Sequence, residues 1–366
     1  MKEALIDNSL TVTIHDTQIP TPGPNQVLIR VVVSGSNPKD WKLPKIFGQT
    51  DSPKNHGDDI ARYVEAFSAS PKNHGDDIAG YVEAVGAGVA QFRKGDRVAA
   101  FHEMMTAHGS YAEFAIAWEG STFHVPERTS FEEAATIPLA AMTAALGLHQ
   151  RLELPLPWNP ATKPIPLVVY GGSTAVGAFA IKLARLANIH PIIAVAGKGA
   201  PFVETLIAKD KGDVVLDYRE GDAVLRQKVK QSTGGSPILH VYDAVSENES
   251  FENVLAALDR GGRFTRVLPL TGNDNVPEGI ECRPTMVGSV HLPSPEGQVV
   301  GDQEFGTALF QFMGWGLAKG WFTGHPYEVR DGGLNGVEGL LKDLHAGKAS
   351  AIKYVVRIGE TPGVQS

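Results

Sequence analysis

The most informative residues lie in one stretch, Val168–Gly177, which reads VVYGGSTAVG. An apolar strand runs into two glycines and two hydroxyl residues, and a helical pattern of apolar residues begins at Val176. Glycines let the backbone approach a pyrophosphate closely, and the free N–H groups at a helix N-terminus favour negative charge. We therefore predict dinucleotide binding here; the alternative is a strand–turn–helix without a ligand. The residues expected to contact the cofactor are Gly171, Gly172, Ser173, Thr174, Ala175, Val176 and Gly177.

The end of the next strand, predicted over 191–196, indicates which dinucleotide binds. Proteins that bind NAD usually place a carboxylate there, which accepts hydrogen bonds from the adenosine ribose. This strand is followed by Gly197 and Lys198, and a lysine would attract the 2′-phosphate of NADPH. We predict NADPH as the cofactor with Lys198 in its site; alternatively, Lys198 is an ordinary surface lysine. Tyr218 and Arg219, after the third strand, are secondary candidates for the adenosine end.

Two kinds of sequence pattern must position these residues. The first ~130 residues show short strands, such as 27–33, between turns rich in Gly and Pro, which is typical of a barrel-like β lobe. Beyond residue 138, strands alternate with helices, which predicts a parallel sheet with crossover connections. The strands are expected over 167–170, 191–196, 214–216, 238–244 and 263–268, and the helices over 176–187, 201–209, 221–231 and 249–259. A last strand near the C-terminus is expected to rejoin the first lobe, which makes that lobe discontinuous.

A tandem repeat interrupts the first lobe. Residues 52–69 recur as 70–87, and the two copies differ at three pairs of positions: Arg62/Gly80, Phe67/Val85 and Ser68/Gly86. Two copies are too few for a solenoid, which needs at least three units to bury a core. We expect the second copy to occupy the strand position, because its glycines continue into the pattern GVAQFRKGDRV. Gly80 is expected at a bulge or a close backbone approach, and Gly86 at a position that needs a positive φ.

Composition excludes several classes of function. The formal charge is −8, which argues against nucleic acid or an anionic membrane as the main partner, since both favour clustered cations. The single cysteine, Cys282, rules out an intramolecular disulfide and a four-cysteine zinc lobe. No signal-peptide pattern and no apolar run of ~18 residues is present, so we expect a cytoplasmic protein without membrane spans.

An ordered set of motifs resembles the medium-chain dehydrogenase/reductase superfamily. They are SGSNPKDWK (34–42), GDDIAGYVEAVGAGVAQFRKGDRV (75–98), IPLAAMTAALGL (137–148), VVYGGSTAVG (168–177), LDYR (216–219) and DGGLNGVEGLLKDLHAGKASAIKYVV (331–356). The chain resembles most its zinc-independent branch of quinone oxidoreductases and fungal trans-acting enoyl reductases. This resemblance implies an α/β fold: a GroES-like β-barrel catalytic domain over 1–137 and 293–366, and an inserted Rossmann domain over 138–292 that binds NADPH.

The resemblance also indicates where the chemistry lies and which metal ligands are missing. Zinc-dependent relatives have a cysteine where this chain has Asn37, and a histidine in the segment matching Gly75–Asp77, so no metal is expected. His56, His74, His102 and His108 show no ligand spacing; His102 and His108 are expected to be loop residues. Asn37, Lys39 and Lys42 are the expected catalytic residues, with either lysine binding a carbonyl, a phosphate or the ribose; alternatively, both lysines are salt-bridged at the surface. Thr143, Leu268 and Lys353 are expected to contact the cofactor, although Lys353 could equally be a surface lysine.

These observations predict a reductase. Without zinc, hydrogen-bond donors must stabilise the negative charge that hydride transfer places on a carbonyl oxygen. We expect hydride transfer from NADPH to the C=C of an enoyl thioester or enone, which is small or carrier-bound and could come from a polyketide synthase in secondary metabolism. The alternatives are an NADPH:quinone oxidoreductase and a cofactor-binding scaffold without turnover.

Overall fold

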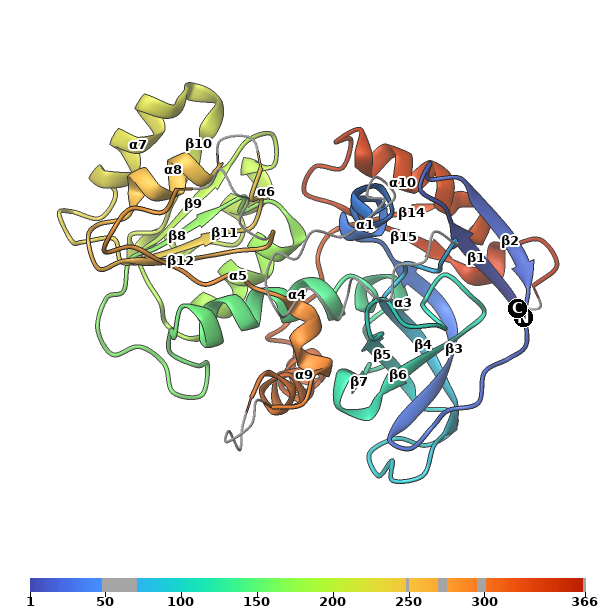
Figure 1. Cartoon of the computed structure of the whole chain (residues 1–366). Helices are drawn as coiled ribbons and strands as arrows, with labels where there is room; N and C mark the ends of the chain where they lie inside the picture. The colour runs from blue at the N-terminus through green and yellow to red at the C-terminus, as the bar shows by residue number, and fades with distance from the viewer. Residues whose placement is uncertain (48–70, 248–249, 269–274, 295–300, 365–366) are drawn as a thin grey trace. The chain divides into compact units, whose positions relative to one another are not determined.

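The computed structural model describes residues 1–47, 71–247, 250–268, 275–294 and 301–364 (Figure 1). It divides into two compact units: unit 1 is Met1–Leu139 with Val290–Ser366, and unit 2 is Ala140–Ser289. Within the described ranges, no helix combines the length and the apolar character that a membrane span requires.

Unit 1 is built on a mostly antiparallel sheet. Its strands follow the order β14-β15-β3-β4-β5-β7, and β6 also pairs with β3. Their bounds are β3 Gln26–Gly35, β4 Asp77–Val85, β5 Arg97–Phe101, β6 Phe114–Trp118, β7 Thr122–His124, β14 Tyr327–Arg330 and β15 Lys353–Arg357. A separate two-stranded ribbon consists of β1 (Lys2–Ile6) and β2 (Val12–Asp16). The C-terminal strand β15 pairs antiparallel with β3, so the end of the chain returns to the first lobe.

Unit 2 contains a parallel sheet in the order β10-β9-β8-β11-β12-β13. The strands are β8 Leu167–Tyr170, β9 Ile192–Ala196, β10 Val214–Asp217, β11 His240–Asp243, β12 Arg263–Arg266 and β13 Glu281–Cys282. The predicted α/β fold class is confirmed. β8 and β11 are neighbours although two strands separate them in sequence, so the strand order reverses between them. Ligands of open parallel sheets bind beyond the carboxyl ends of the strands at such a reversal.

Helices complete both units. In unit 1 they are α1 Lys39–Phe47, α3 Phe131–Ala134, α9 Asp302–Lys319 and α10 Val337–His345. In unit 2 they are α5 Ala175–Leu186, α6 Ala200–Glu204, α7 Asp222–Gln231 and α8 Ser250–Ala257. α4 (Pro138–Ala145) begins in unit 1 and continues into unit 2, where the π-helical turn η2 (Leu146–Arg151) follows it. The 3₁₀ turns are η1 Glu119–Ser121, η3 Lys209–Lys211, η4 Tyr218–Glu220, η5 Val287–His291, η6 Gly333–Gly336 and η7 Ile358–Glu360.

One predicted helix is shorter than the sequence suggests. The apolar pattern predicts a helix over 201–209, but α6 ends at Glu204. In a continued helix, the N–H of Ala208 would donate to the carbonyl of Glu204. Here that N–H donates instead to the carboxylate of Asp213, at 2.9 Å. The same carboxylate accepts the N–H of Ile192 at 2.7 Å, so it draws the chain back toward the sheet.

The second copy of the repeat forms β4, between β3 and β5. A Cβ atom on Gly80 would lie 2.1 Å from the carbonyl oxygen of Arg30, beside a register shift in β3, which confirms the predicted close approach. The expectation for Gly86 is wrong in its reason, because the positive φ of this turn, 88°, belongs to Gly88. A glycine is needed at position 86 because there is no room for a side chain: an added Cβ would lie 1.7 Å from the carbonyl oxygen of Gly23. The first copy, 52–69, lies outside the described residues.

Candidate functional site

The turn after β8 is shaped by two glycines. Gly171 has φ of 83°, a conformation that L side chains rarely adopt. A Cβ on Gly177 would lie 2.2 Å from the carbonyl oxygen of Gly171, so α5 can pack this close to the turn only with glycine there. Thr174 is the N-cap of α5, and its hydroxyl accepts the N–H of Gly177 at 3.0 Å. The turn is therefore held in one conformation before any ligand binds.

This turn leaves backbone donors without partners. The N–H groups of Gly171 and Gly172 both donate to the carbonyl of Val195. The N–H groups of Ser173, Ala175 and Val176 find no acceptor in the part of the chain that the structure describes. Together with the positive end of the twelve-residue helix α5, they form a cradle for phosphate oxygens at the carboxyl edge of the sheet. The predicted loop Gly171–Gly177 therefore fits the diphosphate of a dinucleotide.

The predicted adenosine contacts meet on two adjacent strands. β9 and β10 are parallel neighbours with Asp217 opposite Ala196. Tyr218 lies against Gly197, where an added Cβ would be 2.6 Å from its ring, and Tyr218 is 47% exposed. Lys198 is exposed, and its ammonium has no hydrogen bond or ion pair among the described residues. This rim therefore offers a cation and an aromatic face to a ligand.

Thr143 and Leu268 are two further residues predicted to contact the cofactor. Thr143 is buried in α4, and its carbonyl accepts a hydrogen bond from the Tyr242 hydroxyl at 2.7 Å. Leu268 is half-buried and lies two residues beyond the end of β12, which stops at Arg266 rather than at 268. Their contacts with the cofactor stay predictions.

In unit 1, Lys39 lies inside an ion cluster. Its ammonium is 2.8 Å from an Asp40 oxygen, pairs with Asp76, and donates to the His74 carbonyl at 2.6 Å. The ammonium of Lys39 therefore lies between two carboxylates and one carbonyl, and all three of these groups are acceptors. Burial alone would lower the pKa of Lys39, but the two carboxylates raise it above its ordinary value, so the ammonium stays charged.

A second lysine has internal oxygen partners in the same way. Lys353 is 4% exposed, so it is not a surface lysine. Its ammonium pairs with Asp77 and donates to the Asn37 side-chain oxygen at 3.1 Å and to the Thr136 carbonyl at 3.4 Å. The side-chain nitrogen of Asn37 donates to Asp77 at 2.7 Å, so both the oxygen and the nitrogen of this amide have partners in the cluster. The predicted contact of Lys353 with the cofactor stays a prediction.

Sequence reasoning missed the other members of the cluster. His102 is outside a strand, as predicted, but it is only 2% exposed. Its Nδ1 lies 2.8 Å from Asp76 and its Nε2 lies 3.0 Å from the Ala107 carbonyl, and both of these partners are acceptors. The adjacent carboxylates of Asp76 and Asp77 are the one sequence signal that could have revealed this cluster.

Asp40 connects the cluster to the start of α1. Its carboxylate accepts the Tyr111 hydroxyl at 2.8 Å and the N–H of Asn37 at 2.8 Å. Burial raises the pKa of Asp40 to about 6, although Lys39 opposes this shift. Burial also acts to raise the pKa of Asp76, but Lys39 and His102 outweigh it and hold that pKa below the ordinary value. These contacts fix the segment 37–40 from which α1 begins.

Lys42 has a different setting, one turn along α1. Its side chain is half-buried, and its ammonium lies 5.6 Å from the centre of the Trp41 ring. That ring meets His345 of α10 edge-on, with centroids 4.6 Å apart. The catalytic role predicted for Asn37, Lys39 and Lys42 stays a prediction, but the structure places Lys39 and Lys353 in the cluster and Lys42 beside the Trp41 ring.

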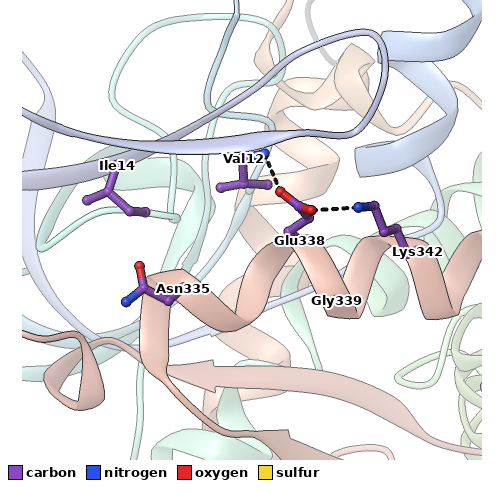
Figure 2. A pocket seen from close by; sticks show the side chains of 6 residues that line it. All are labelled: Val12, Ile14, Asn335, Glu338, Gly339 and Lys342. Carbon is purple, nitrogen blue, oxygen red and sulfur yellow. Dashed lines mark hydrogen bonds and ion pairs between the residues drawn. The ribbon is translucent and has the colours of Figure 1, made fainter.

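A cavity of about 400 Å³ lies elsewhere in unit 1 (Figure 2). Val12 and Ile14 of β2 form one wall, and Glu338 of α10 crosses the gap to accept the N–H of Val12 at 2.9 Å. The remaining wall consists of Asn335, Gly339 and Lys342. None of the residues predicted for the site lines this cavity.

The described donor groups around Asn37 and Asp76 are already engaged within the protein. Both oxygens of Asp76 are already engaged, one by Lys39 and the other by His102. The side chain of Asn37 is held by Asp77 and Lys353. Within the described ranges, no three His, Cys, Asp or Glu side chains are grouped so that they could hold a metal. His56 lies outside the described residues.

Two family matches cover most of the chain. Residues 23–127 match the family described as alcohol dehydrogenase GroES-like domain. Residues 175–309 match the family described as zinc-binding dehydrogenase. The first match lies in unit 1, and the second begins at the first residue of α5, runs through the rest of unit 2 and ends at residue 309 in unit 1.

Individual relatives are more specific. The chain is 40% identical to a trans-enoyl reductase, fsr4, of Gibberella fujikuroi over 339 residues, which is 92% of each protein. Among solved structures, the enoyl reductase CurK superposes with a TM-score of 0.74 at 19% identity, covering 97% of this chain and 98% of that one. An alcohol dehydrogenase superfamily protein of Novosphingobium aromaticivorans superposes with a TM-score of 0.76 at 20% identity, covering 98% and 99%.

Proposed function

Because the chain belongs to the medium-chain dehydrogenase/reductase superfamily, and within it to the fungal trans-enoyl reductases, we propose that it is a cytoplasmic, zinc-free, NADPH-dependent enoyl reductase. The substrate is an enoyl thioester or enone of secondary metabolism, small or carried by a polyketide synthase. The observation that carries this proposal is the preformed phosphate loop with its unpaired N–H groups, in a chain 40% identical to a trans-enoyl reductase.

The residues of unit 2 would hold the cofactor. The N–H groups of Ser173, Ala175 and Val176 fit the diphosphate, and Lys198 fits the 2′-phosphate. The exposed face of Tyr218 suits the adenine ring. When bound, NADPH supplies a hydride from its nicotinamide ring to the β-carbon of the substrate.

In unit 1, we assign the stabilisation of the developing enolate to Lys42. The ammonium groups of Lys39 and Lys353 each have three internal oxygen partners, which disfavours a contact with a substrate oxygen. Lys42 lies in α1, the helix that begins at this fixed segment. A lysine ammonium can donate a hydrogen bond to the substrate's carbonyl oxygen as negative charge develops on that oxygen. Asn37, Lys39 and Lys353 are then positioning residues that hold this end of α1.

A zinc ion has no part in this proposal. The cluster's carboxylates already neutralise two ammonium groups, and its amide and imidazole groups are hydrogen-bonded within the protein. We expect turnover to survive exhaustive chelation and elemental analysis to find well under one zinc per chain. Loss of activity on chelation that zinc restores would contradict this assignment.

The first experiment is an NADPH-oxidation assay with a crotonyl thioester and with a panel of quinones. We expect oxidation with the thioester and little with the quinones. Turnover of the quinones alone would favour a quinone oxidoreductase. Binding of NADPH without turnover of either class would favour a scaffold and would overturn the proposed activity.

The role of Lys42 is tested by Lys42→Ala, with Lys45→Ala as its matched control. Lys45 lies on the same helix, where its ammonium contacts His345 at 3.1 Å. Removing an oxyanion donor typically lowers the rate by about 10²–10³-fold. We expect that loss in kcat for Lys42→Ala, with unchanged NADPH affinity, and a normal kcat for Lys45→Ala. Equal kcat in the two variants would show that the anion is stabilised elsewhere.

A further inference from the structure

The rim of unit 2 holds a second cation beside Lys198. Asp217 ends β10, opposite Ala196 at the end of β9, and Arg219 follows two residues later in η4. Because β9 and β10 are adjacent in the sheet (Figure 1), the residues that follow their ends form one rim. Tyr218 packs against Gly197 at this point, which joins the two turns directly.

The guanidinium of Arg219 is already engaged. Its Nε donates to both oxygens of Asp217, at 2.9 and 3.1 Å, and a terminal nitrogen donates to the same carboxylate. Such a two-pronged contact is also the geometry in which arginine binds phosphate. The side chain of Arg219 is 50% exposed, so a ligand phosphate could reach the fork if the carboxylate released it.

Asp217 also builds the turn that presents Arg219. Its Oδ1 accepts the backbone N–H of Arg219 at 2.9 Å, and it is the N-cap of η4. The carboxylate therefore has two separable functions: a neutral oxygen suffices for the cap, but the charge is needed to hold the guanidinium. Asparagine keeps the first function and loses the second.

We propose that Asp217 limits the affinity of this chain for the 2′-phosphate of its cofactor by holding Arg219 in an internal fork. Lys198 then supplies the positive charge that the phosphate meets, while Arg219 contributes none because its charge is neutralised. The Asp217 carboxylate itself repels the phosphate. This inference rests on the proposed use of NADPH and assigns a specificity-determining role to a residue outside the phosphate loop.

The test compares Asp217→Asn with the matched control Glu220→Gln. Glu220 belongs to the same turn, but its carboxylate pairs with Lys228 of α7 rather than with Arg219. Calorimetry measures binding of NADPH and NADH, and of 2′,5′-ADP and 5′-AMP, which isolate the phosphate. An exposed charge-assisted contact supports an expected gain of roughly 3–10-fold for NADPH and 2′,5′-ADP in Asp217→Asn. NADH and 5′-AMP should change by less than about twofold, and Glu220→Gln by less than about twofold for all four.

A double variant completes the test. Adding Arg219→Ala to Asp217→Asn should abolish the gain, because Arg219 is the group that the substitution releases. Weaker NADPH binding in Asp217→Asn would show that the carboxylate directs Arg219 toward the phosphate and would overturn the inference. An equal gain in Glu220→Gln would reduce the effect to bulk charge and would also overturn it.

Results that contradict the proposed NADPH dependence differ from results that contradict only the role of Asp217. If the unmodified protein bound NADPH and NADH equally, or if Lys198→Glu weakened both to the same extent, the proposed NADPH dependence itself would be wrong. If Lys198→Glu weakened NADPH selectively while Asp217→Asn left every ligand unchanged, the role of Asp217 alone would fail. Melting curves of each variant separate binding effects from misfolding.

Discussion

The polar groups of the two units differ in whether they have partners within the protein. In unit 1, Lys353 is buried and Lys39 is half-buried, and the ammonium of each lies among three internal oxygen atoms. In unit 2, the loop after β8 leaves backbone donors without partners, and Lys198 is exposed and unpaired among the described residues. Donors that already have internal partners can fix a segment of the chain but are not available to a ligand. Backbone donors that have no partner among the described residues can bind a ligand's phosphate oxygens. The difference predicts that changes in the ion cluster of unit 1 mainly affect stability, whereas changes at the loop and rim of unit 2 mainly affect cofactor affinity.

The largest effect is expected from the two deletions that remove one copy of the repeat. Deleting 52–69 leaves β4 intact, whereas deleting 70–87 places Arg62 at the position of Gly80 and Ser68 at that of Gly86. Both positions lie within 2.1 Å of a backbone oxygen when a Cβ is added, so the second deletion forces apart neighbouring segments of unit 1. With about 1–3 kcal/mol for each overpacked site, we expect several kcal/mol of destabilisation or failure to fold.

Thermal melting of the two deletion proteins measures this difference directly. They have identical length and differ at three side chains. Indistinguishable melting temperatures would show that neither glycine is required, and that the sheet of unit 1 tolerates either copy.

The next effect contrasts two lysine-to-methionine substitutions. Lys39→Met leaves the carboxylates of Asp40 and Asp76 buried without their shared cation, and breaking a buried ion pair in this way typically costs about 3–5 kcal/mol. Lys198→Met removes an exposed cation with no partner in the described chain. We therefore expect a large loss in the free energy of unfolding for Lys39→Met, measured by denaturant titration, and almost none for Lys198→Met.

The same pair of variants gives the reverse order in affinity. A charge-assisted contact contributes about 1.5–3 kcal/mol, so Lys198→Met should weaken NADPH binding by roughly 10–150-fold and leave NADH binding nearly unchanged. Lys39→Met, where it folds, should bind NADPH normally. A Lys39→Met protein that is stable but binds NADPH poorly would contradict the division between the units.

The smallest effect is a dependence of stability on pH. Burial and, less strongly, Arg263 lower the pKa of His240 in unit 2 to about 4. In the unfolded chain, this histidine binds a proton below its ordinary pKa of about 6.5, so stability is lost as the pH falls from about 6.5 toward 4. His240→Gln should flatten this slope by an amount of the order of 1 kcal/mol. The control is His15→Gln on the exposed face of β2, and equal slopes in the two variants would refute the assignment.

Sequence alone was most informative where the controlling interactions are local. The glycines of the phosphate loop, the strand that precedes it and the helix that follows lie within twenty residues, and the structure reproduces their order. Lys198 lies after the second strand, as the sequence indicates, and its contact with the cofactor stays a prediction. The predicted close approach at Gly80 was also confirmed, since a glycine inside a strand pattern has few other causes.

Other properties were decided only by tertiary structure. Lys353 and Asn37 are 316 residues apart in the sequence. No local pattern reveals that the Lys353 ammonium donates a hydrogen bond to the side-chain oxygen of Asn37. His102 is a loop residue, as predicted, but the sequence does not show that its ring contacts the carboxylate of Asp76, 26 residues away. Gly86 was assigned a positive φ that belongs to Gly88, because two glycines in one turn look alike in sequence. The physical reason is the same in each case: local sequence fixes backbone conformation, whereas the partners of a buried charge come from strands and helices that only the folded chain brings together.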